Sequence, residues 1–293
     1  MDEAGAQLLG LLDIERLEHD LFRGRDLPDP GSRRIFGGLV IAQALLAAYG
    51  TVEDEARLCH SLHAYFLRGG DPGRPVIYQV DRSRAGGSFT TRRVVAIQHG
   101  EQIFHLSASF HVPEQGWEHQ HAMPEVAGPE NWADRRASRA RDAARLEDPR
   151  VLDFLRDRAI EMREVAPRDI LDPGPADDRN AVWLRLPAAR GQGARMKQAL
   201  LAYASDMGLL GAALRPHGLT WFQGRVMSAS LDHAMWFHGP AAIEDWHLYA
   251  MDSPWAGGAR AFTRGAIYDR AGALRASAAQ EGLMRPLLRK PHS

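Results

Sequence analysis

Two stretches of the chain carry apolar residues on nearly every face of a helix. Residues 37–49 run Gly-Gly-Leu-Val-Ile-Ala-Gln-Ala-Leu-Leu-Ala-Ala-Tyr, and residues 206–216 mix Met and Leu with small residues. A helix that is hydrophobic all round is buried on every side. Glycine commonly follows the last turn of a helix, as Gly50 and Gly218 do here. The pattern therefore predicts two buried helices, the second with Asp206 at its N-terminal end.

Each of these helices is followed by four runs rich in alternating, β-branched or aromatic residues. Such runs predict strands, and Gly100 and Gly272 mark tight turns between them. The predicted strands are residues 60–68, 75–83, 88–98 and 102–112 in the first copy and residues 225–238, 246–253, 260–268 and 274–284 in the second. A strand region also precedes each helix, at residues 14–23 in the first copy and at residues 161–165 and 181–186 in the second.

Equivalent markers in the two copies keep a nearly constant spacing. Tyr249 follows Tyr78 by 171 residues, and Gly272 follows Gly100 by 172 residues. A constant offset over several markers indicates an internal repeat. One buried helix followed by a four-stranded antiparallel meander, twice over, predicts an α+β fold called a double hotdog, in which each sheet wraps around a central helix.

The repeat divides the chain into three parts. We expect an N-terminal hotdog repeat at residues 1–115, a linker at residues 116–158 and a C-terminal hotdog repeat at residues 159–293. Residues 133–158 of the linker are rich in alanine and charge and predict a surface helix. Because acidic residues alternate with arginine there, the pattern favours a solvated helix over a basic binding patch.

Composition and charge exclude several kinds of protein. The 293 residues include 36 Lys and Arg and 37 Asp and Glu, a net charge of −1, so the electrostatic footprint of a nucleic-acid-binding protein is missing. The single cysteine, Cys59, cannot form an internal disulfide. The acidic N-terminus lacks the pattern of a signal peptide, and the most apolar stretch, residues 37–50, is shorter than the roughly 20 residues that span a bilayer. We therefore expect a cytoplasmic protein without membrane insertion.

Five short segments point to one family. They are Arg34-Ile35-Phe36-Gly37-Gly38, Leu62-His63-Ala64-Tyr65-Phe66-Leu67-Arg68-Gly69-Gly70, Ala202-Tyr203-Ala204-Ser205-Asp206, Ser230-Leu231-Asp232-His233-Ala234-Met235-Trp236-Phe237-His238 and Ala279-Gln280-Glu281-Gly282. In order and with few gaps, the chain resembles the type II acyl-CoA thioesterases from about residue 8 to residue 286. The resemblance implies a double hotdog that hydrolyses fatty acyl-CoA to free fatty acid and CoA without a cofactor. It also implies a homo-oligomer, a dimer or tetramer of double hotdogs.

The same resemblance implies a catalytic triad. In the family an Asp, a Thr and a Gln hold the attacking water, and their positions correspond to Asp206, Ser230 and Gln280. Serine in place of the family's threonine keeps the hydroxyl but loses the methyl group that stiffens χ1. Each residue also has a structural explanation, since Asp206 could cap a helix, Ser230 could bond to the backbone, and a buried Gln280 needs partners for its amide.

Other candidate residues lie beside this triad. Gly37 and Gly38 begin the first helix, where exposed N–H groups could bind an oxyanion, although glycine there could serve only close packing. Asp232 more plausibly orients the backbone or His233 than reacts itself. The 13 histidines give no zinc-ligand spacing and no His-Glu-x-x-His, so we expect no metal site.

Two other functions remain as alternatives. Hotdog hydratases act on enoyl thioesters with an Asp-x4-His pair, but Gly211 stands five residues after Asp206. A non-catalytic acyl-CoA-binding double hotdog would be favoured if one of the three triad positions carried Ala or Val. All three carry side chains that can act chemically. The sequence therefore favours an acyl-CoA thioesterase, with an acyl-chain tunnel formed by residues such as Leu39, Met207 and Leu210.

Overall fold

The computed structural model describes residues 2–25, 34–135, 137, 145 and 159–287. In the first half, the elements are α1 (Glu3–Leu12), β1 (Glu15–Glu18), β2 (Leu21–Arg23), α2 (Gly37–Tyr49), β3 (Leu58–Phe66), β4 (Ile77–Ala85), β5 (Phe89–Gln98) and β6 (Glu101–His111). The four strands predicted after α2 are confirmed to within two residues at each end, whereas the strand predicted at residues 14–23 is divided into β1 and β2, which pair with each other.

The second half follows the same order with additional short helices. Its elements are η1 (Pro129–Asn131), β7 (Glu161–Glu164), β8 (Asn180–Arg185), η3 (Pro187–Ala189), α5 (Ala194–Ser205), α6 (Gly211–Leu214), η4 (Arg215–His217), η5 (Trp221–Gln223), β9 (Val226–Ser230), β10 (Asp232–Phe237), β11 (His247–Gly257), β12 (Arg260–Asp269) and β13 (Leu274–Pro286). The predicted strand at residues 225–238 is divided at Leu231 into β9 and β10.

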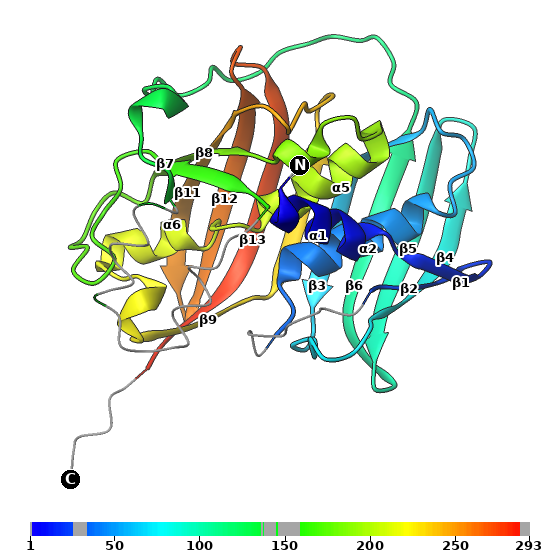
Figure 1. The fold of residues 1–293 in the computed structure, drawn as a ribbon, viewed down its shortest axis with the longest axis horizontal. Coiled ribbons are helices and arrows are strands. Elements are labelled where there is room, and N and C mark those ends of the chain that lie inside the picture. The colour runs from blue at the N-terminus through cyan, green and yellow to red at the C-terminus, as the bar shows by residue number, and fades with distance from the viewer. Residues whose placement is uncertain (1, 26–33, 136, 138–144, 146–158, 288–293) are drawn as a thin grey trace.

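The thirteen strands found among the described residues belong to one antiparallel sheet. Their order is β1-β2-β4-β5-β6-β3-β10-β13-β12-β11-β8-β7, with β9 paired to β13. The two halves join where β3 pairs with β10, with Ala64 opposite His233. Figure 1 shows the two halves of the sheet on either side of the helices α1, α2 and α5. Gly100 and Gly272 lie in the β5–β6 and β12–β13 turns with φ of 76° and 85°, a conformation that glycine adopts without strain.

The two central helices form the core between these halves. Helix α2 is buried along almost its whole length, from Gly38 to Tyr49, and it packs against α5. Helix α5 is buried from Ala199 to Ser205. The helix predicted at residues 37–49 is confirmed, because its apolar side chains have no solvent-facing side. Two antiparallel meanders wrapped around two adjacent buried helices constitute a double hotdog.

The prediction for the second central helix was wrong. That helix is α5, which ends at Ser205, and Asp206 is its C-cap residue rather than the beginning of a helix over 206–216. Sequence patterning missed α5 because its first turns carry Lys197 and Gln198. These polar side chains find partners elsewhere in the fold, since Gln198 donates to the carbonyl of Cys59 across the junction of the halves and Lys197 bonds Glu244 within the second half.

Two further predictions concern the ends of the repeats. Most of the predicted helix at residues 133–158 lies outside the described residues, and the boundaries at residues 115 and 158 remain predictions.

Helix α1 was not predicted. The side chain of Asp2 caps it by accepting a 2.9 Å hydrogen bond from the Gly5 amide, and Leu8 and Leu12 pack into the core. Within the part of the chain that the structure describes, no helix has the length and apolarity needed to cross a membrane.

Candidate active site

A cavity of about 350 Å³ opens where the two halves meet. Its walls come from the beginning of α2, the end of α5, the segment around α6 and η5, and strands β9 and β13. The residues that line it include Ile35, Phe36, Gly37, Asp206, Met207, Leu210, Trp221, Phe222, Ser230 and Gln280. Most of these side chains are apolar. Asp206, Ser230 and Gln280 therefore share one mainly apolar wall.

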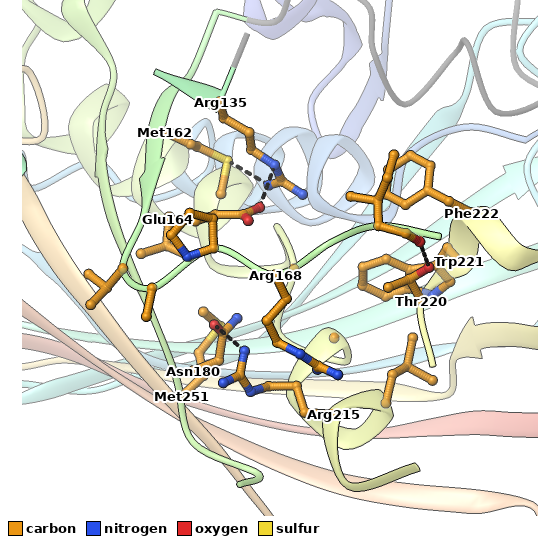
Figure 2. Close-up of a pocket in the computed structure, with 18 of the residues that line it drawn as sticks. Arg135, Met162, Glu164, Arg168, Asn180, Arg215, Thr220, Trp221, Phe222 and Met251 are labelled. Carbon is orange, nitrogen blue, oxygen red and sulfur yellow. Dashed lines mark hydrogen bonds and ion pairs between the residues drawn. The ribbon is translucent and has the colours of Figure 1, made fainter. Parts of the chain in front are cut away.

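A smaller cavity of about 110 Å³ lies behind the first and shares Met207, Trp221 and Phe222 with it. Figure 2 shows Arg168, Arg215 and Asn180 on one side of it, with the guanidinium of Arg215 turned toward Asn180. There Arg215 donates to Asn180 Oδ1 across 3.4 Å. Charged side chains line both cavities, Arg34, Asp134 and Arg135 in the larger one and Arg135, Arg168 and Arg215 in the smaller one.

The structure brings the three predicted catalytic residues together. Ser230 Oγ lies 3.4 Å from Asp206 Oδ1, and Gln280 Nε2 lies 2.5 Å from Ser230 Oγ. The sheet explains the second contact, because β9 pairs with β13 and places Ser230 opposite Gly282, two residues from Gln280. Asp206 reaches the same point from the end of α5. The carboxylate, hydroxyl and amide thus come from three separate elements.

The beginning of α2 faces this triad. A Cβ atom at Gly37 would lie 2.7 Å from Asp206 Oδ2, and a Cβ atom at Gly38 would lie 2.4 Å from the carbonyl oxygen of Tyr203. Only glycine allows this approach, so the packing explanation for the two glycines is supported. The same approach places the N-terminal end of α2, with its unpaired N–H groups, against Asp206. Oxyanion binding by these groups stays a prediction.

Sequence reasoning missed a buried histidine behind the triad. His233 on β10 lies 2.9 Å through Nδ1 from Gln280 Oε1 and 2.9 Å through Nε2 from Ser205 Oγ. Complete burial lowers the pKa of His233 to about 4, an effect that the contact with Gln280 only partly opposes. The side chain is therefore a neutral imidazole at physiological pH. The Asp-His pair was the signal in the sequence, but it did not show which partners His233 has.

Two other groups fix the backbone around the site. Asp232 Oδ1 accepts a 2.6 Å hydrogen bond from the backbone N–H of Glu281, next to Gln280, and burial raises the pKa of Asp232. The Tyr249 hydroxyl donates to the carbonyl of Ser205 across 2.7 Å. Burial, followed by the charge of Asp206, raises the pKa of Tyr249, so this phenol stays protonated and holds the end of α5.

The remaining predicted residues divide between the cavity and the core. Met207 and Leu210 line the cavity, whereas Leu39 is buried in the core of α2 and lines neither cavity. Within the described part of the chain, no three His, Cys, Asp or Glu side chains converge in a way that could hold a metal ion. The arrangement offers the carboxylate of Asp206, the hydroxyl of Ser230, the amide of Gln280 and the N-terminal end of α2 beside a mainly apolar cavity. That set can activate a water molecule beside an acyl group.

Comparison with known proteins gives a consistent result. A family profile described as acyl-CoA thioesterase matches residues 156–283, and one described as acyl-CoA thioesterase N-terminal domain matches residues 26–111. Acyl-CoA thioesterase 2 of Haemophilus influenzae is 38% identical over 278 residues, which cover 95% of this chain and 96% of that protein. Acyl-coenzyme A thioesterase 8 of Rattus norvegicus is 40% identical over 283 residues, covering 94% and 88% of the two chains.

Solved structures show the same architecture. A crystal structure of an acyl-CoA thioesterase II from Mycobacterium marinum matches with a TM-score of 0.78 and 39% identity, covering 96% of this chain and 98% of that chain. A protein with a hot dog fold from Alicyclobacillus acidocaldarius matches with a TM-score of 0.75, 18% identity and coverage of 96% and 98%. The second likeness concerns the fold alone.

Proposed function

The chain belongs to the acyl-CoA thioesterase family, and on that premise we propose that it hydrolyses fatty acyl-CoA with a water held by Asp206, Ser230 and Gln280. The enzyme is an acyl-CoA thioester hydrolase, as its relatives and family profiles show. The fatty nature of the acyl group and the roles of the three side chains are the proposal. The observation that supports it is the contact of a carboxylate, a hydroxyl and an amide at the wall of one apolar cavity.

Asp206 is the general base in this mechanism. Its carboxylate removes a proton from the water as the water oxygen attacks the carbonyl carbon of the thioester. A tetrahedral intermediate forms, with negative charge on the former carbonyl oxygen. Its collapse breaks the carbon–sulfur bond, and the proton held by Asp206 passes to the CoA sulfur. The products are a free carboxylic acid and CoA with a free thiol.

Ser230 and Gln280 hold the reacting groups in place. Ser230 Oγ lies between Asp206 and Gln280, where it can orient a water on the carboxylate. The oxyanion of the intermediate needs donors aimed at it, which commonly contribute the largest part of the acceleration. The first N–H groups of α2, at Gly37 and Gly38, are the candidates, and Gly37 lines the cavity. A serine nucleophile is disfavoured because the only base beside Ser230 in this scheme is a carboxylate.

The apolar walls account for the acyl group. Met207, Leu210, Trp221 and Phe222 enclose the cavity beside the triad. Burial of apolar surface favours binding by about 25 cal/mol for each Å² removed from water. A hydrocarbon chain placed there would bring its thioester carbonyl to Asp206. The cavity therefore supports a fatty acyl substrate over a short polar one.

Release of free thiol from a panel of acyl-CoA substrates of increasing chain length tests this proposal. We expect hydrolysis that rises with chain length until the cavity is filled, and loss of hydrolysis in Asp206→Asn. Binding of acyl-CoA without thiol release would support the non-catalytic alternative. Hydration of an enoyl-CoA without hydrolysis would support the hydratase alternative, which Gly211 at the position of the hydratase histidine disfavours.

We also propose that two or more copies associate. Tyr65 on β3 and Trp236 on β10 are 53% and 37% exposed, on the pair of strands that joins the two halves. Trp236 meets His63 edge to face, with ring centroids 5.3 Å apart. A second copy covering this aromatic face would remove it from water. Light scattering should then give at least twice the 32.5 kDa of one chain, and a mass of one chain at micromolar concentration would contradict the proposal.

A further inference from the structure

A continuous line of hydrogen bonds ends on the carboxylate of Asp206. Ser230 Oγ contacts Asp206 Oδ1, Gln280 Nε2 contacts Ser230 Oγ, and Gln280 Oε1 contacts Nδ1 of His233 at 2.9 Å. Nε2 of His233 then contacts Ser205 Oγ at 2.9 Å. His233 is completely buried, at 0% exposure, and lines neither cavity, whereas Gln280, at 2% exposure, forms part of the cavity wall.

The chemistry of each group fixes the direction of this line. An ionised carboxylate only accepts hydrogen bonds, so the single hydroxyl proton of Ser230 goes to Asp206. Ser230 Oγ must then accept from Gln280, which turns the NH₂ group of the amide toward Ser230. The amide carbonyl consequently faces His233 and needs a donor there. His233 must carry its proton on Nδ1.

Burial leaves the ring of His233 a single proton to place. Because desolvation lowers the pKa of His233 to about 4, the ring is neutral near pH 7 and holds one proton. With that proton on Nδ1, Nε2 is an acceptor. The Ser205 hydroxyl donates to the carbonyl oxygen of Ala202 across 2.8 Å, and its oxygen lies 2.9 Å from Nε2. Its single proton can go to one of these two acceptors only, so the contact with Gln280 is what assigns the tautomer of His233.

We propose that His233 is a positioning residue that holds the side-chain amide of Gln280 with its NH₂ group directed at Ser230 and the cavity. This inference rests on the proposed catalytic role of Gln280. Its consequence is that Gln280 offers a donor to the reacting groups. Gln280 can then bind the water oxygen or the developing oxyanion, and it cannot accept a proton from the water. Without the Nδ1–H of His233, the amide can rotate and direct its carbonyl at Ser230.

Substitutions at position 233 test this role by separating donation from packing. His233→Leu fills the buried position with an apolar side chain that has no hydrogen-bond donor. We expect kcat to fall about 10- to 100-fold, the usual effect of removing a supporting partner behind a functional group. KM should change little because His233 does not line the cavity. His233→Asn has an N–H group close to the position of Nδ1, and it should recover most of the lost kcat. His247→Leu is the matched control, because His247 is equally buried at 1% exposure and lies on β11 away from the triad.

A double-mutant cycle distinguishes this inference from the proposed function. If His233 acts through Gln280, His233→Leu should lower kcat in the wild-type background and have no further effect in Gln280→Ala. Equal effects in both backgrounds, or failure of His233→Asn to recover more activity than His233→Leu, would overturn the positioning role. If Gln280→Ala itself retains full kcat, the proposed role of Gln280 fails instead.

Nitrogen NMR of the histidine side chains in the unmodified enzyme provides a test that needs no variant. His233 should give the signals of a neutral ring protonated at Nδ1 throughout the range from pH 6 to pH 8. A ring protonated at Nε2 in that range would refute the inference, whether or not His233→Leu folds.

Discussion

Asp206→Asn separates the catalytic role of the carboxylate from any structural one. The substitution keeps the size of the side chain and an oxygen that can accept from Ser230. It removes the base, so kcat should fall about 10²- to 10⁴-fold, the usual contribution of general-base catalysis. Initial rates of thiol release at saturating acyl-CoA measure this change. Asp245→Asn, the same chemical change at a position outside the cavity, should leave kcat unaltered.

The structure predicts that the stability of Asp206→Asn changes little. Asp206 is the C-cap of α5, where the helix dipole disfavours a negative charge by about 0.3–1 kcal/mol. Its Oδ2 atom also faces Gly37 at the beginning of α2, where the dipole favours the charge by a similar amount. These terms nearly cancel, so Tm should shift by less than about 4 °C. Near-full kcat in a folded variant would refute the role of Asp206 as base, whereas a Tm lower by 10 °C or more would attribute the lost activity to unfolding.

Three further predictions follow from the same geometry. Ser230→Thr should keep kcat within a few-fold of wild type because it retains the hydroxyl. Ser230→Ala should leave a measurable rate because a water, and not the serine, attacks the thioester, and complete loss of activity in Ser230→Ala would contradict this mechanism. The pKa of His233 is about 4 in the folded protein and 6.5 in the unfolded chain. The free energy of unfolding is therefore highest above pH 6.5, and it falls by about 3 kcal/mol as the pH is lowered from 6.5 to 4, because the unfolded chain then binds a proton that the folded protein does not. Denaturant unfolding at several pH values should accordingly show a weaker pH dependence in His233→Asn than in wild type, and equal slopes would refute the low pKa. Leu210→Ala enlarges the cavity and should shift kcat/KM toward longer acyl chains, and an unchanged chain-length profile would place the acyl group elsewhere.

The regular parts of the fold were predictable from the pattern of apolar residues. Helix α2 lies between the two halves of the sheet with no exposed face, so its sequence is apolar throughout. The strands alternate because one face of the sheet covers the helices. Helix α5 plays the same role with a different pattern, because in its first turns Lys197 bonds Glu244 of the same half and Gln198 bonds Cys59 of the other half. A local pattern cannot show that distant partners will satisfy these polar side chains.

The candidate site was predictable only in part for a related reason. Family resemblance identified Asp206, Ser230 and Gln280, and the structure brings them into contact. It did not identify His233, whose importance depends on contacts with Gln280, 47 residues away, and with Ser205, 28 residues away. Sequence alone also placed Asp206 at the wrong end of a helix. The direction of the hydrogen bonds at the site becomes visible only when all of these partners are placed.

The site lies where the second repeat departs from the first. The C-cap of α5, Asp206, follows the C-cap of α2, Gly50, by 156 residues, whereas the strand markers Tyr78 and Tyr249 are 171 residues apart. The second repeat therefore contains about 15 additional residues between its central helix and its meander, within 206–225. That segment supplies α6, η5 and the cavity-lining residues Met207, Leu210, Trp221 and Phe222.

The two repeats also differ at the positions that carry the chemistry. Gly50 takes the place of Asp206, and Ala108, which pairs with Leu62, takes the place of Gln280 at an offset of 172 residues. The first repeat has Arg92 on the neighbouring strand, and it bonds Thr51 just beyond the end of α2 through Nε across 2.8 Å. The guanidinium of Arg92 is thus bonded to Thr51, and the positions equivalent to Asp206 and Gln280, which are Gly50 and Ala108, carry neither a carboxylate nor an amide. The duplicated framework thus supplies α2 and its N-terminal end from one repeat, whereas the base, the amide and most of the cavity wall come from the other.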